Sequence, residues 1–369
     1  MAKRYFEENI GKLGYGNMRL PRVDGKIDTV TINSMIDRFL AAGFSYFDTA
    51  YVYGGSEEVL RESLVKRYPR DQFQIATKMA LMSAKGPEGM QEQLDTSLSR
   101  LGVEFIDFYL LHGLNSAFIK LADEYDAWGF LRGLKEKGVV RYIGFSFHGT
   151  PEELEMLLEK HPYIELVQLQ INYLDWENPE VQSRRLYEIA RAHDAPISVM
   201  EPNKGGWLAG ETSESGLMLK GEKPDASVAS WAFRFLLGLD GILTILSGVG
   251  TVEEVEDNIK TFKENKPLSG EEYELIKKAV EIINGTPSIP CTGCNYCTPH
   301  CPQKINIPGF LALYNQYLTH KSMDTLKHIN AMMGNRSESC LKCAACEKVC
   351  PQHLKISVYL EEITELVRG

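Results

Sequence analysis

The chain has 369 residues, of which 44% are hydrophobic and 24% are charged, and 40 basic against 50 acidic residues give a formal net charge of −10. This composition is typical of globular proteins and excludes a disordered, collagen-like or coiled-coil chain. The acidic balance argues against nucleic acid or an anionic membrane as the main partner. No run of 18 apolar residues is present, and the first residues, MAKRYFEENIG, lack an apolar segment. We therefore expect neither a transmembrane helix nor a signal peptide, and either two domains or a large barrel with an appendage.

Strand-like and helical segments alternate through the first 285 residues. Strand-like runs cover residues 13–18, 44–49, 73–78, 105–112, 141–146, 164–171, 196–201 and 241–248. Helical patterns lie between them, for example at 29–42, 88–101, 120–138, 177–193 and 251–264. Strands that are each followed by a helix predict a parallel (β/α)8 TIM barrel. A doubly wound sheet is the alternative, but it would need an early phosphate loop, and no GxGxxG or GxxxxGKS motif follows any strand.

Segments outside this alternation complete the first domain. We expect residues 1–12 to form a small cap before the first strand and residues 269–283 to form one extra helix. A Gly-Thr-Pro-Ser-Ile-Pro linker follows at 285–290.

Polar side chains close most of the apolar strand-like runs. They are Asp48, Lys78, His112, Ser146, Gln168 with Asn172, Glu201 and Ser247. Each one taken alone is compatible with a structural role such as a turn cap or a solvated charge. Because the carboxyl ends of the strands of a parallel barrel emerge at one mouth, the set together predicts an active site there.

The sequence FDTAYVYGGSE, followed by ATK at the end of the next strand and LLH at the end of the one after, resembles the aldo-keto reductases. IGFS, VQLQIN and SGVGTVEEVEDNI extend the resemblance in the same order, over roughly residues 10–283. The resemblance implies a catalytic set of Asp48, Tyr53, Lys78 and His112. In such a set Tyr53 gives a proton to the alkoxide formed by hydride transfer. Lys78 would favour the phenolate, Asp48 would hold Lys78, and His112 would orient the carbonyl oxygen or relay the proton.

The resemblance also implies a bound NADH or NADPH and a small-molecule carbonyl substrate. Ser146, Gln168 and Asn172 would contact the carboxamide of the nicotinamide. The other implied cofactor contacts are Gly16, Asn17, Met18, Glu201, Pro202, Asn203, Ser247, Gly248, Val249, Gly250, Thr251, Asp257 and Asn258. Residues 201–206 would line the pyrophosphate, and the helix start at 247–251 offers backbone N–H groups to an anion.

The sequence departs from the family pattern in three ways. Ser146 is followed by Phe147 in place of the usual Asn, so one amide contact to the cofactor is either missing or supplied by Asn172. Gly248 and Glu254 stand where NADPH-dependent members place Lys or Arg, so NADH becomes plausible because a carboxylate repels the 2′-phosphate. Glu201 replaces the usual Ser after strand seven, either to bind a ribose hydroxyl or as a buried structural carboxylate.

All eight cysteines lie between residues 291 and 350 and form two runs of the pattern CxxCxxCxxxCP. Each cysteine of the second run lies 49 positions after its counterpart, so the segment is an internal repeat. The pattern predicts two [4Fe–4S] clusters in which the fourth cysteine of each run ligates the other cluster. The predicted ligand sets are Cys291, Cys294, Cys297 and Cys350 for one cluster, and Cys340, Cys343, Cys346 and Cys301 for the other.

Zinc and disulfides are the alternatives for these cysteines. Zinc prefers paired CxxC arms and would leave the third cysteine of each run unexplained, and disulfides would need an oxidising compartment. We expect a reducing cytoplasm, in an organism that tolerates little oxygen. Residues 302–339 are predicted to be helical and another helix follows Pro351, so the tail resembles helical dicluster ferredoxin domains. The predicted domains are 1–284, an aldo-keto reductase-like barrel, and 285–369, a ferredoxin-like domain.

Three functions are compatible with this combination. The first is a carbonyl reductase whose clusters are structural or serve a redox partner protein. The second is an electron-transfer oxidoreductase that couples the clusters to a flavin, such as FMN bound in the barrel, or to a flavoprotein, because nicotinamide gives two electrons and a cluster takes one. The third is a non-catalytic nucleotide sensor, against which the complete catalytic set argues. The sequence indicates neither the identity of the carbonyl substrate nor the oligomeric state.

Overall fold

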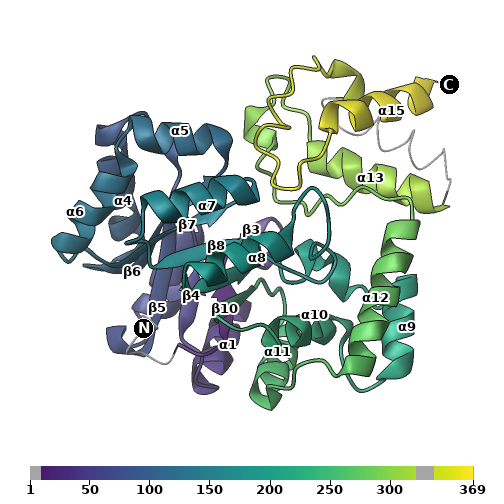
Figure 1. Ribbon diagram of the computed structural model, residues 1–369, viewed down its shortest axis with the longest axis horizontal. Coiled ribbons are helices and arrows are strands. Elements are labelled where there is room, and N and C mark those ends of the chain that lie inside the picture. The colour runs from purple at the N-terminus through teal and green to yellow at the C-terminus, as the bar shows by residue number, and fades with distance from the viewer. Residues whose placement is uncertain (1–9, 321–335, 369) are drawn as a thin grey trace. The chain divides into compact units, whose positions relative to one another are not determined.

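The computed structural model describes residues 10–320 and 336–368, and Figure 1 shows their helices and strands. The chain divides into two compact units. The first comprises Met1–Asn178, Gln182–Asn203 and Ala229–Tyr273, and the second comprises Pro179–Val181, Lys204–Val228 and Glu274–Gly369. The predicted boundary between residues 284 and 285 stays a prediction. No helix within the described ranges is long and apolar enough to cross a membrane.

In the described residues, the first unit is a closed barrel of parallel strands surrounded by helices (Figure 1). The strands are β1 (Leu13–Gly16), β4 (Tyr46–Asp48), β5 (Gln74–Met79), β6 (Ile106–Leu114), β7 (Val140–Phe147), β8 (Leu166–Gln170), β9 (Ile197–Met200) and β10 (Ile242–Ser247). Each pairs with its neighbour in parallel, and β1 closes the barrel between β10 and β4. Each strand falls within or overlaps a predicted one, so the TIM barrel prediction is confirmed.

Local capping explains where several barrel helices begin. Asp28 accepts hydrogen bonds from the N–H groups of Val30 and Thr31 at the start of α1 (Thr29–Ala41). Thr150 and Glu153 form a reciprocal capping box at α7 (Pro151–Lys160). The other α-helices of this unit are α2 (Ser56–Leu60), α3 (Leu81–Ala84), α4 (Pro87–Leu101), α5 (Ser116–Glu124), α6 (Ala127–Glu136), α8 (Ser183–Ala192), α10 (Val228–Leu237) and α11 (Val252–Glu264). Helix α12 (Gly270–Gly285) begins in the first unit and continues in the second from Glu274.

Three local predictions were wrong or incomplete. The single helix expected over 120–138 is two helices, α5 and α6, because Asp126 adopts a left-handed backbone (φ 51°) and its side chain caps α6 through the N–H of Gly129. The helix expected from residue 177 begins only at Ser183. A short antiparallel pair, β2 (Arg22–Val23) and β3 (Lys26–Ile27), was not predicted. The expected cap over residues 1–12 falls mostly outside the described residues.

The barrel interior is filled by aromatic and aliphatic side chains from neighbouring strands. Tyr46 and Phe108 lie with ring centroids 5.1 Å apart, and Tyr142 stacks on Phe108 from the next strand. Gly144 of β7 allows β8 to approach closely, since a Cβ at this position would lie 2.1 Å from the carbonyl oxygen of Leu166. The interior below the mouth is therefore a packed core and not a channel.

In the second unit, α13 (Ile307–His320) and α15 (Ile356–Arg368) pack around one hydrophobic cluster (Figure 1). α15 confirms the helix predicted after Pro351. Part of the helix predicted over 302–339 is α13, and residues 321–335 of that segment lie outside the described ranges. The unit also contains residues 204–228 with α9 (Glu214–Glu222), which the sequence prediction assigned to the barrel.

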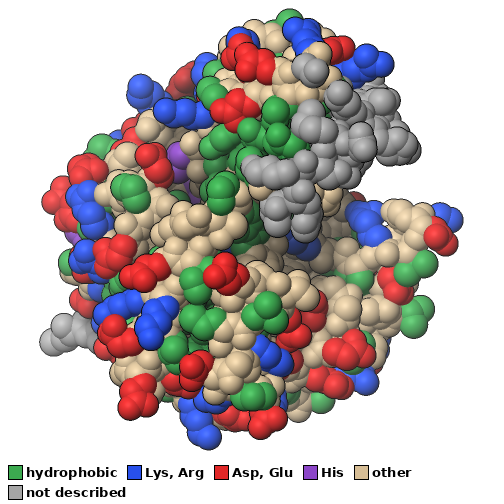
Figure 2. Space-filling model, turned by 90° about the vertical axis from the view of Figure 1, so that its right-hand side faces the viewer, with side chains coloured by type: hydrophobic (Ala, Val, Ile, Leu, Met, Phe, Trp, Pro, Cys, Tyr) green, Lys and Arg blue, Asp and Glu red, His purple; other side chains and the backbone are tan. Residues whose placement is uncertain are grey.

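Charged side chains of both signs are interspersed over the face shown in Figure 2. Exposed ion pairs among the described residues include Arg184 with Glu177 and Arg185 with Glu152. Such pairs add little stability.

The close approach at Gly144 leads to a stability prediction. Gly144→Ala should lower the free energy of unfolding of the barrel by about 3 kcal/mol, because the new methyl group meets backbone and not a movable side chain. Gly133→Ala is the matched control, since a Cβ there meets nothing within 4 Å and lies inside α6. The control should leave stability unchanged or raise it by up to about 1 kcal/mol. Urea unfolding measures both, and a Gly144→Ala protein as stable as the wild type would contradict the packing described.

Candidate functional site

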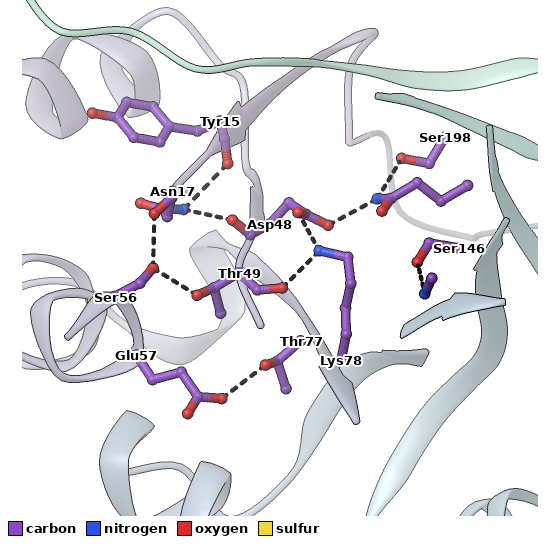
Figure 3. Close-up of polar contacts among 12 residues, drawn as sticks. Tyr15, Asn17, Asp48, Thr49, Ser56, Glu57, Thr77, Lys78, Ser146 and Ser198 are labelled. Carbon is purple, nitrogen blue, oxygen red and sulfur yellow. Dashed lines mark hydrogen bonds and ion pairs between the residues drawn. The ribbon is translucent and has the colours of Figure 1, made fainter. Parts of the chain in front are cut away.

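Asp48 and Lys78 form a buried ion pair at the carboxyl ends of β4 and β5 (Figure 3). The Lys78 Nζ lies 2.5 Å from Asp48 Oδ1 and 2.7 Å from the carbonyl oxygen of Thr49, and it donates to both. Lys78 has no exposed surface, and Asp48 is 4% exposed. A second donor, the amide of Gln168 on β8, lies 3.0 Å from the other carboxylate oxygen of Asp48. The pair is thus held from three strands.

Burial controls the electrostatics of this pair. It raises the pKa of Asp48 above its usual value, against the opposing charge of Lys78 and the hydrogen bonds from Lys78 and Gln168. It lowers the pKa of Lys78 below its usual value, against the opposing charge of Asp48. Neither charge would be tolerated in this position without the other.

Tyr53 lies in the turn after β4, above the ion pair. Its N–H donates to the carbonyl of Ala50, and its carbonyl accepts from the N–H of Ser56, which closes the turn. The centre of its ring is 5.1 Å from the Lys78 Nζ and 5.5 Å from the centre of the His112 ring, which it meets edge to face. The structure therefore brings Asp48, Lys78, Tyr53 and His112 together as the sequence predicts.

An irregularity in β6 orients the side chain of His112. The register between β6 and β7 shifts between Leu111 and Leu114, and Gly113 there has a positive φ of 64°. The Gly113 N–H donates to the hydroxyl of Ser146 at 2.7 Å, which fixes the bulge. Burial, together with the charge of Lys78 and the proximity of His148, lowers the pKa of His112 well below its ordinary value. His112 is therefore neutral near pH 7.

A ring of short polar side chains braces the strand ends around Asp48 (Figure 3). The Asn17 amide donates to the carbonyl oxygens of Tyr15 and Asp48, which joins β1 to β4. Ser56 donates to the carbonyl of Asn17 and shares a hydrogen bond with Thr49. Asn17, predicted as a cofactor contact, is 1% exposed and braces this loop junction.

The residues expected at the nicotinamide carboxamide already have protein partners. Gln168 donates to Asp48, and Ser146 accepts from the Gly113 N–H. Asn172 donates to the carboxylate of Asp175 at 2.7 Å and to the carbonyl of Glu201 at 3.1 Å. Asn172 also accepts from the N–H of Asp175. These contacts fix the orientation of the amides at the mouth.

The residues expected at the phosphates lie after β9 and β10. Glu201 has a left-handed backbone (φ 55°) and pairs with Arg19 at 3.2 Å, so its carboxylate has a protein partner. Asn258 donates to Ser247 at 2.9 Å, and Thr251 caps α11. The Glu254 carboxylate accepts from the Gly250 N–H at 2.7 Å, within the loop where an anion site was expected. The other predicted positions in these segments are Pro202, Asn203, Gly248, Val249 and Asp257, of which Pro202 and Val249 are buried. Two further predicted positions, Gly16 and Met18, lie at the end of β1 and just after it.

The second unit contains two cavities, each lined by four cysteines. Cys291, Cys294, Cys297 and Cys350 line the first cavity. Cys301, Cys340, Cys343 and Cys346 line the second cavity. This is the partition that the sequence predicts, with the fourth cysteine of each run facing the cavity of the other.

The internal repeat extends to the backbone. Positive φ angles recur at Gly293 and Lys342, at Asn295 and Ala344, and at Lys304 and His353, each pair 49 positions apart. The N–H of Lys304 bonds to the carbonyl of Cys301 as that of His353 does to Cys350. The two cysteine loops thus share one conformation, including at Lys and Ala, which rarely adopt it.

The eight thiols provide an all-sulfur donor set of the kind that holds iron–sulfur clusters. All eight thiols are free of disulfides. Within the described part of the chain, no three His, Cys, Asp or Glu side chains converge closely enough to hold one metal ion. Burial raises the pKa of Cys297 to about 12 and that of Cys346 to about 11, so these thiols must lose protons when they bind metal.

Residues 12–281 match the model of the aldo/keto reductase family, and residues 290–354 match that of the 4Fe-4S dicluster domain. The chain belongs to the aldo/keto reductase family. Its C-terminal part matches a 4Fe–4S dicluster domain in addition. This combination confirms the resemblance drawn from the FDTAYVYGGSE segment and from the cysteine spacing.

Curated relatives include aldo-keto reductase str7 of Strobilurus tenacellus, 30% identical, with 55% of this chain and 61% of that protein aligned. A probable aldo-keto reductase 1 of Glycine max is 32% identical over 45% of this chain and 49% of its own length. The NADH-specific methylglyoxal reductase of Escherichia coli is 22% identical, over 74% of this chain and 96% of its own length. The chain thus spans only about half to two thirds of the first two relatives.

Solved structures show the same fold. An aldo-keto reductase from Klebsiella pneumoniae in complex with NADPH superposes with a TM-score of 0.60 and 20% sequence identity, covering 75% of this chain and 95% of that one.

Sequence reasoning missed several residues that shape the site. Thr49, Ser56 and Ser198 carry short side chains that occur in many loops and strands, so no pattern distinguishes them. Gly113 offered a signal, since a glycine directly after a histidine at a strand end is compatible with a bulge.

The ion pair leads to a prediction about stability. Lys78→Met should lower the free energy of unfolding by about 3–5 kcal/mol, because it leaves the Asp48 carboxylate buried without its partner. The double variant Asp48→Asn/Lys78→Met should recover most of this loss. Lys66→Met is the matched control, because the Lys66–Glu62 pair has a short distance of 2.6 Å but both side chains are more than half exposed. Its effect should stay below about 0.5 kcal/mol. Equal effects of the two single variants in urea unfolding would contradict the role assigned to burial.

Proposed function

We propose that the protein reduces an aldehyde or ketone to an alcohol with NAD(P)H, and that Tyr53 is the proton donor. The observation that carries the proposal is the position of the Lys78 ammonium, 5.1 Å from the Tyr53 ring and fixed by Asp48. A cation held this close to a phenol favours its ionised form. It therefore assists the loss of a proton from a group that is otherwise a weak acid.

The reduction needs a hydride on the carbonyl carbon and a proton on the carbonyl oxygen, and the dihydronicotinamide supplies the hydride. The Tyr53 O–H bond breaks as the new O–H bond of the alcohol forms, and the resulting phenolate is stabilised by Lys78. Asp48 keeps Lys78 in place throughout. Solvent at the mouth then returns a proton to Tyr53.

His112 acts in this scheme as a neutral imidazole. Its ring meets Tyr53 edge to face, and the bulge at Gly113 fixes its direction. A neutral imidazole can donate one N–H to the carbonyl oxygen and so orient it toward Tyr53. A charged imidazolium beside Lys78 would instead add like-charge repulsion.

We further propose NADH in preference to NADPH. Support comes from Glu254, whose carboxylate bonds to the Gly250 N–H in the loop that would face the 2′-phosphate. A carboxylate there repels a phosphate and occupies one of the backbone donors that would bind it. The name of the Escherichia coli relative, an NADH-specific reductase, agrees with this preference.

The eight cysteines would hold two [4Fe–4S] clusters, in the two sets that line the cavities. The clusters would serve as structural supports or pass single electrons to a redox partner protein. The two cavities also support a second candidate function, electron transfer between nicotinamide and the clusters. That function would need a flavin or a flavoprotein as intermediary, because hydride carries two electrons and a cluster accepts one.

Tyr53→Phe tests the proton donor. The variant should lose about 10²–10⁴-fold in kcat for carbonyl reduction, the range of a positioned acid, while its affinity for NADH stays within about twofold. Tyr51→Phe is the control, because its ring lies against Arg100 and not against Lys78. Steady-state kinetics and fluorescence titration with NADH measure the two effects. Turnover unchanged in Tyr53→Phe would refute the assigned role.

The lowered pKa of His112 predicts the pH profile. Because the folded protein loses the His112 proton well below the ordinary imidazole pKa, kcat/KM should show no acid limb from this residue between about pH 6 and pH 8. Rates measured at a fixed saturating NADH concentration test this. A limb with a midpoint near the ordinary value of about 6.5 that disappears in His112→Gln would contradict a neutral His112.

Glu254→Gln tests the cofactor preference. The wild-type protein should use NADH with a higher kcat/KM than NADPH, and the variant should narrow that ratio by about tenfold, since it removes a like charge facing the 2′-phosphate. Glu253→Gln, an exposed neighbour, is the control and should leave the ratio unchanged. A wild-type preference for NADPH would overturn the proposal for the cofactor without affecting that for Tyr53.

A further inference from the structure

Two residues that are far from the cysteines in the sequence contact both loops of the first cysteine-lined cavity. They are Lys204 and Gly205, which follow β9 and lie within the span matched to the aldo/keto reductase model. Both nevertheless belong to the second compact unit, which includes Lys204–Val228. Their contacts with the cysteine loops therefore lie inside one unit.

Lys204 contacts the loop that carries Cys350. It is 3% exposed, and its ammonium donates to the side-chain oxygen of Gln352 at 2.9 Å. Gln352 is 7% exposed, follows Cys350 by two positions and lines the first cavity. Because a hydrogen bond from a charged donor is stronger than one between neutral groups, this buried bond can hold the loop in place.

Gly205 contacts the loop that carries Cys291 and Cys294. A Cβ on residue 205 would lie 2.8 Å from both the Cβ and the carbonyl oxygen of Thr292. Thr292 stands between these two cysteines, is 6% exposed and also lines the first cavity. The close approach depends on glycine, because φ at residue 205 is 65° and a side chain there would meet the backbone of the cysteine loop.

We propose that Lys204 and Gly205 are positioning residues for the [4Fe–4S] cluster of the first cavity. This inference rests on the cluster assignment made under the proposed function, and it extends the site beyond residues 290–354, the segment matched to the dicluster domain. Three ligands of this cluster come from one loop and the fourth, Cys350, comes from the other, so both loops must be held at a fixed separation. Two consecutive residues of one segment contact both loops, and partners of this kind around metal ligands strengthen metal binding.

The contacts predict an effect on one cluster and not on both. Thr292 and Gln352 line the first cavity, and neither is among the described residues that line the second. Loosening Lys204 or Gly205 should therefore release the iron of the first cysteine set sooner than that of the second. A general role in the folding of the unit would instead release the iron of both sets together.

The test is the release of iron from the iron-loaded full-length protein under argon, with EDTA as the chelator and the iron retained by the protein as the readout. Wild-type protein should contain about eight irons per chain, as two [4Fe–4S] clusters require. Lys204→Met should lose about four of them roughly tenfold faster or more, the range expected when a partner around metal ligands is removed. The other four should be released at the wild-type rate. A Cys343→Ser background, which lacks one ligand of the second set, assigns the two phases.

A double-mutant cycle isolates the bond between Lys204 and Gln352 from the other contacts of either residue. Gln352→Met should release the same four irons faster, and the double variant Lys204→Met/Gln352→Met should be no faster than the faster of the two single variants. Lys223→Met is the matched control, because this exposed lysine lies in the same segment of the second unit. Its iron should be released at the wild-type rate.

Gly205→Ala tests the other contact, with Gly206→Ala as its control. Gly206 has an even larger positive φ of 98°, but a Cβ there would meet no described atom within 4 Å. Both variants strain the backbone, whereas only Gly205→Ala displaces Thr292. Gly205→Ala should therefore release four irons roughly tenfold faster than Gly206→Ala does.

Each outcome decides the inference. A Lys204→Met protein purified with only the four irons of the second set would support it. Release at the wild-type rate in Lys204→Met, additive effects in the double variant or equal release in the two glycine variants would overturn it while leaving the clusters established. Faster release of all eight irons together would also overturn it, because the segment would then support the whole unit. Wild-type protein that binds no iron would overturn the cluster assignment and this inference together, without affecting the proposal for Tyr53.

Discussion

A lysine ammonium without any exposed surface at the end of β5 is the constraint on which the barrel mouth depends. Lys78 can be charged there only because Asp48 lies 2.5 Å away, and Asp48 in turn is held by the Gln168 amide. Asn17, Thr49 and Ser56 fix the loop that presents Asp48, and the same turn places Tyr53 over the ammonium. Stability and chemistry therefore depend on the same ion pair. The buried Asp48 carboxylate holds the Lys78 ammonium next to the Tyr53 phenol.

The second unit contains one short cysteine-rich sequence that occurs twice. The two loops reproduce the same left-handed residues and the same backbone hydrogen bonds, and the fourth cysteine of each loop faces the cavity of the other. Neither cavity is complete without both loops. Residues outside the repeat lie beside the first cysteine loop: Lys204 donates to Gln352, and Gly205 lies against Thr292.

Much of this could be predicted from the sequence because the decisive residues stand at recognisable places. Asp48, Lys78 and His112 close apolar strands, and the cysteine spacing fixes the ligand sets through the topology of interleaved loops. Other features depend on contacts that no local pattern records. Asp126 divides a predicted helix through its own left-handed backbone, and Gly113 shifts the register of β6. Lys204 is buried against Gln352, which lies almost 150 positions later in the chain. The local sequence KGG indicates only a turn.

Glu254 lies between these two groups: the sequence indicates the residue, and the structure shows its hydrogen-bond partner. Its charge alone argued against a phosphate, and the hydrogen bond to the Gly250 N–H shows that it also occupies a backbone donor. The sequence likewise left two roles open for Glu201, and the ion pair with Arg19 shows that its carboxylate has a protein partner. In both cases the sequence identifies the residue type, whereas its contact can be seen only in the folded structure.

The central proposal is that the barrel reduces carbonyl compounds with hydride from NADH and a proton from Tyr53. The most direct measurement is an anaerobic assay of the iron-loaded protein with NADH and a panel of aldehydes and ketones, in which alcohol product and cluster absorbance are followed together. The account predicts one alcohol for each NADH consumed, with the cluster absorbance unchanged. Bleaching of the clusters by NADH without formation of any alcohol would contradict it.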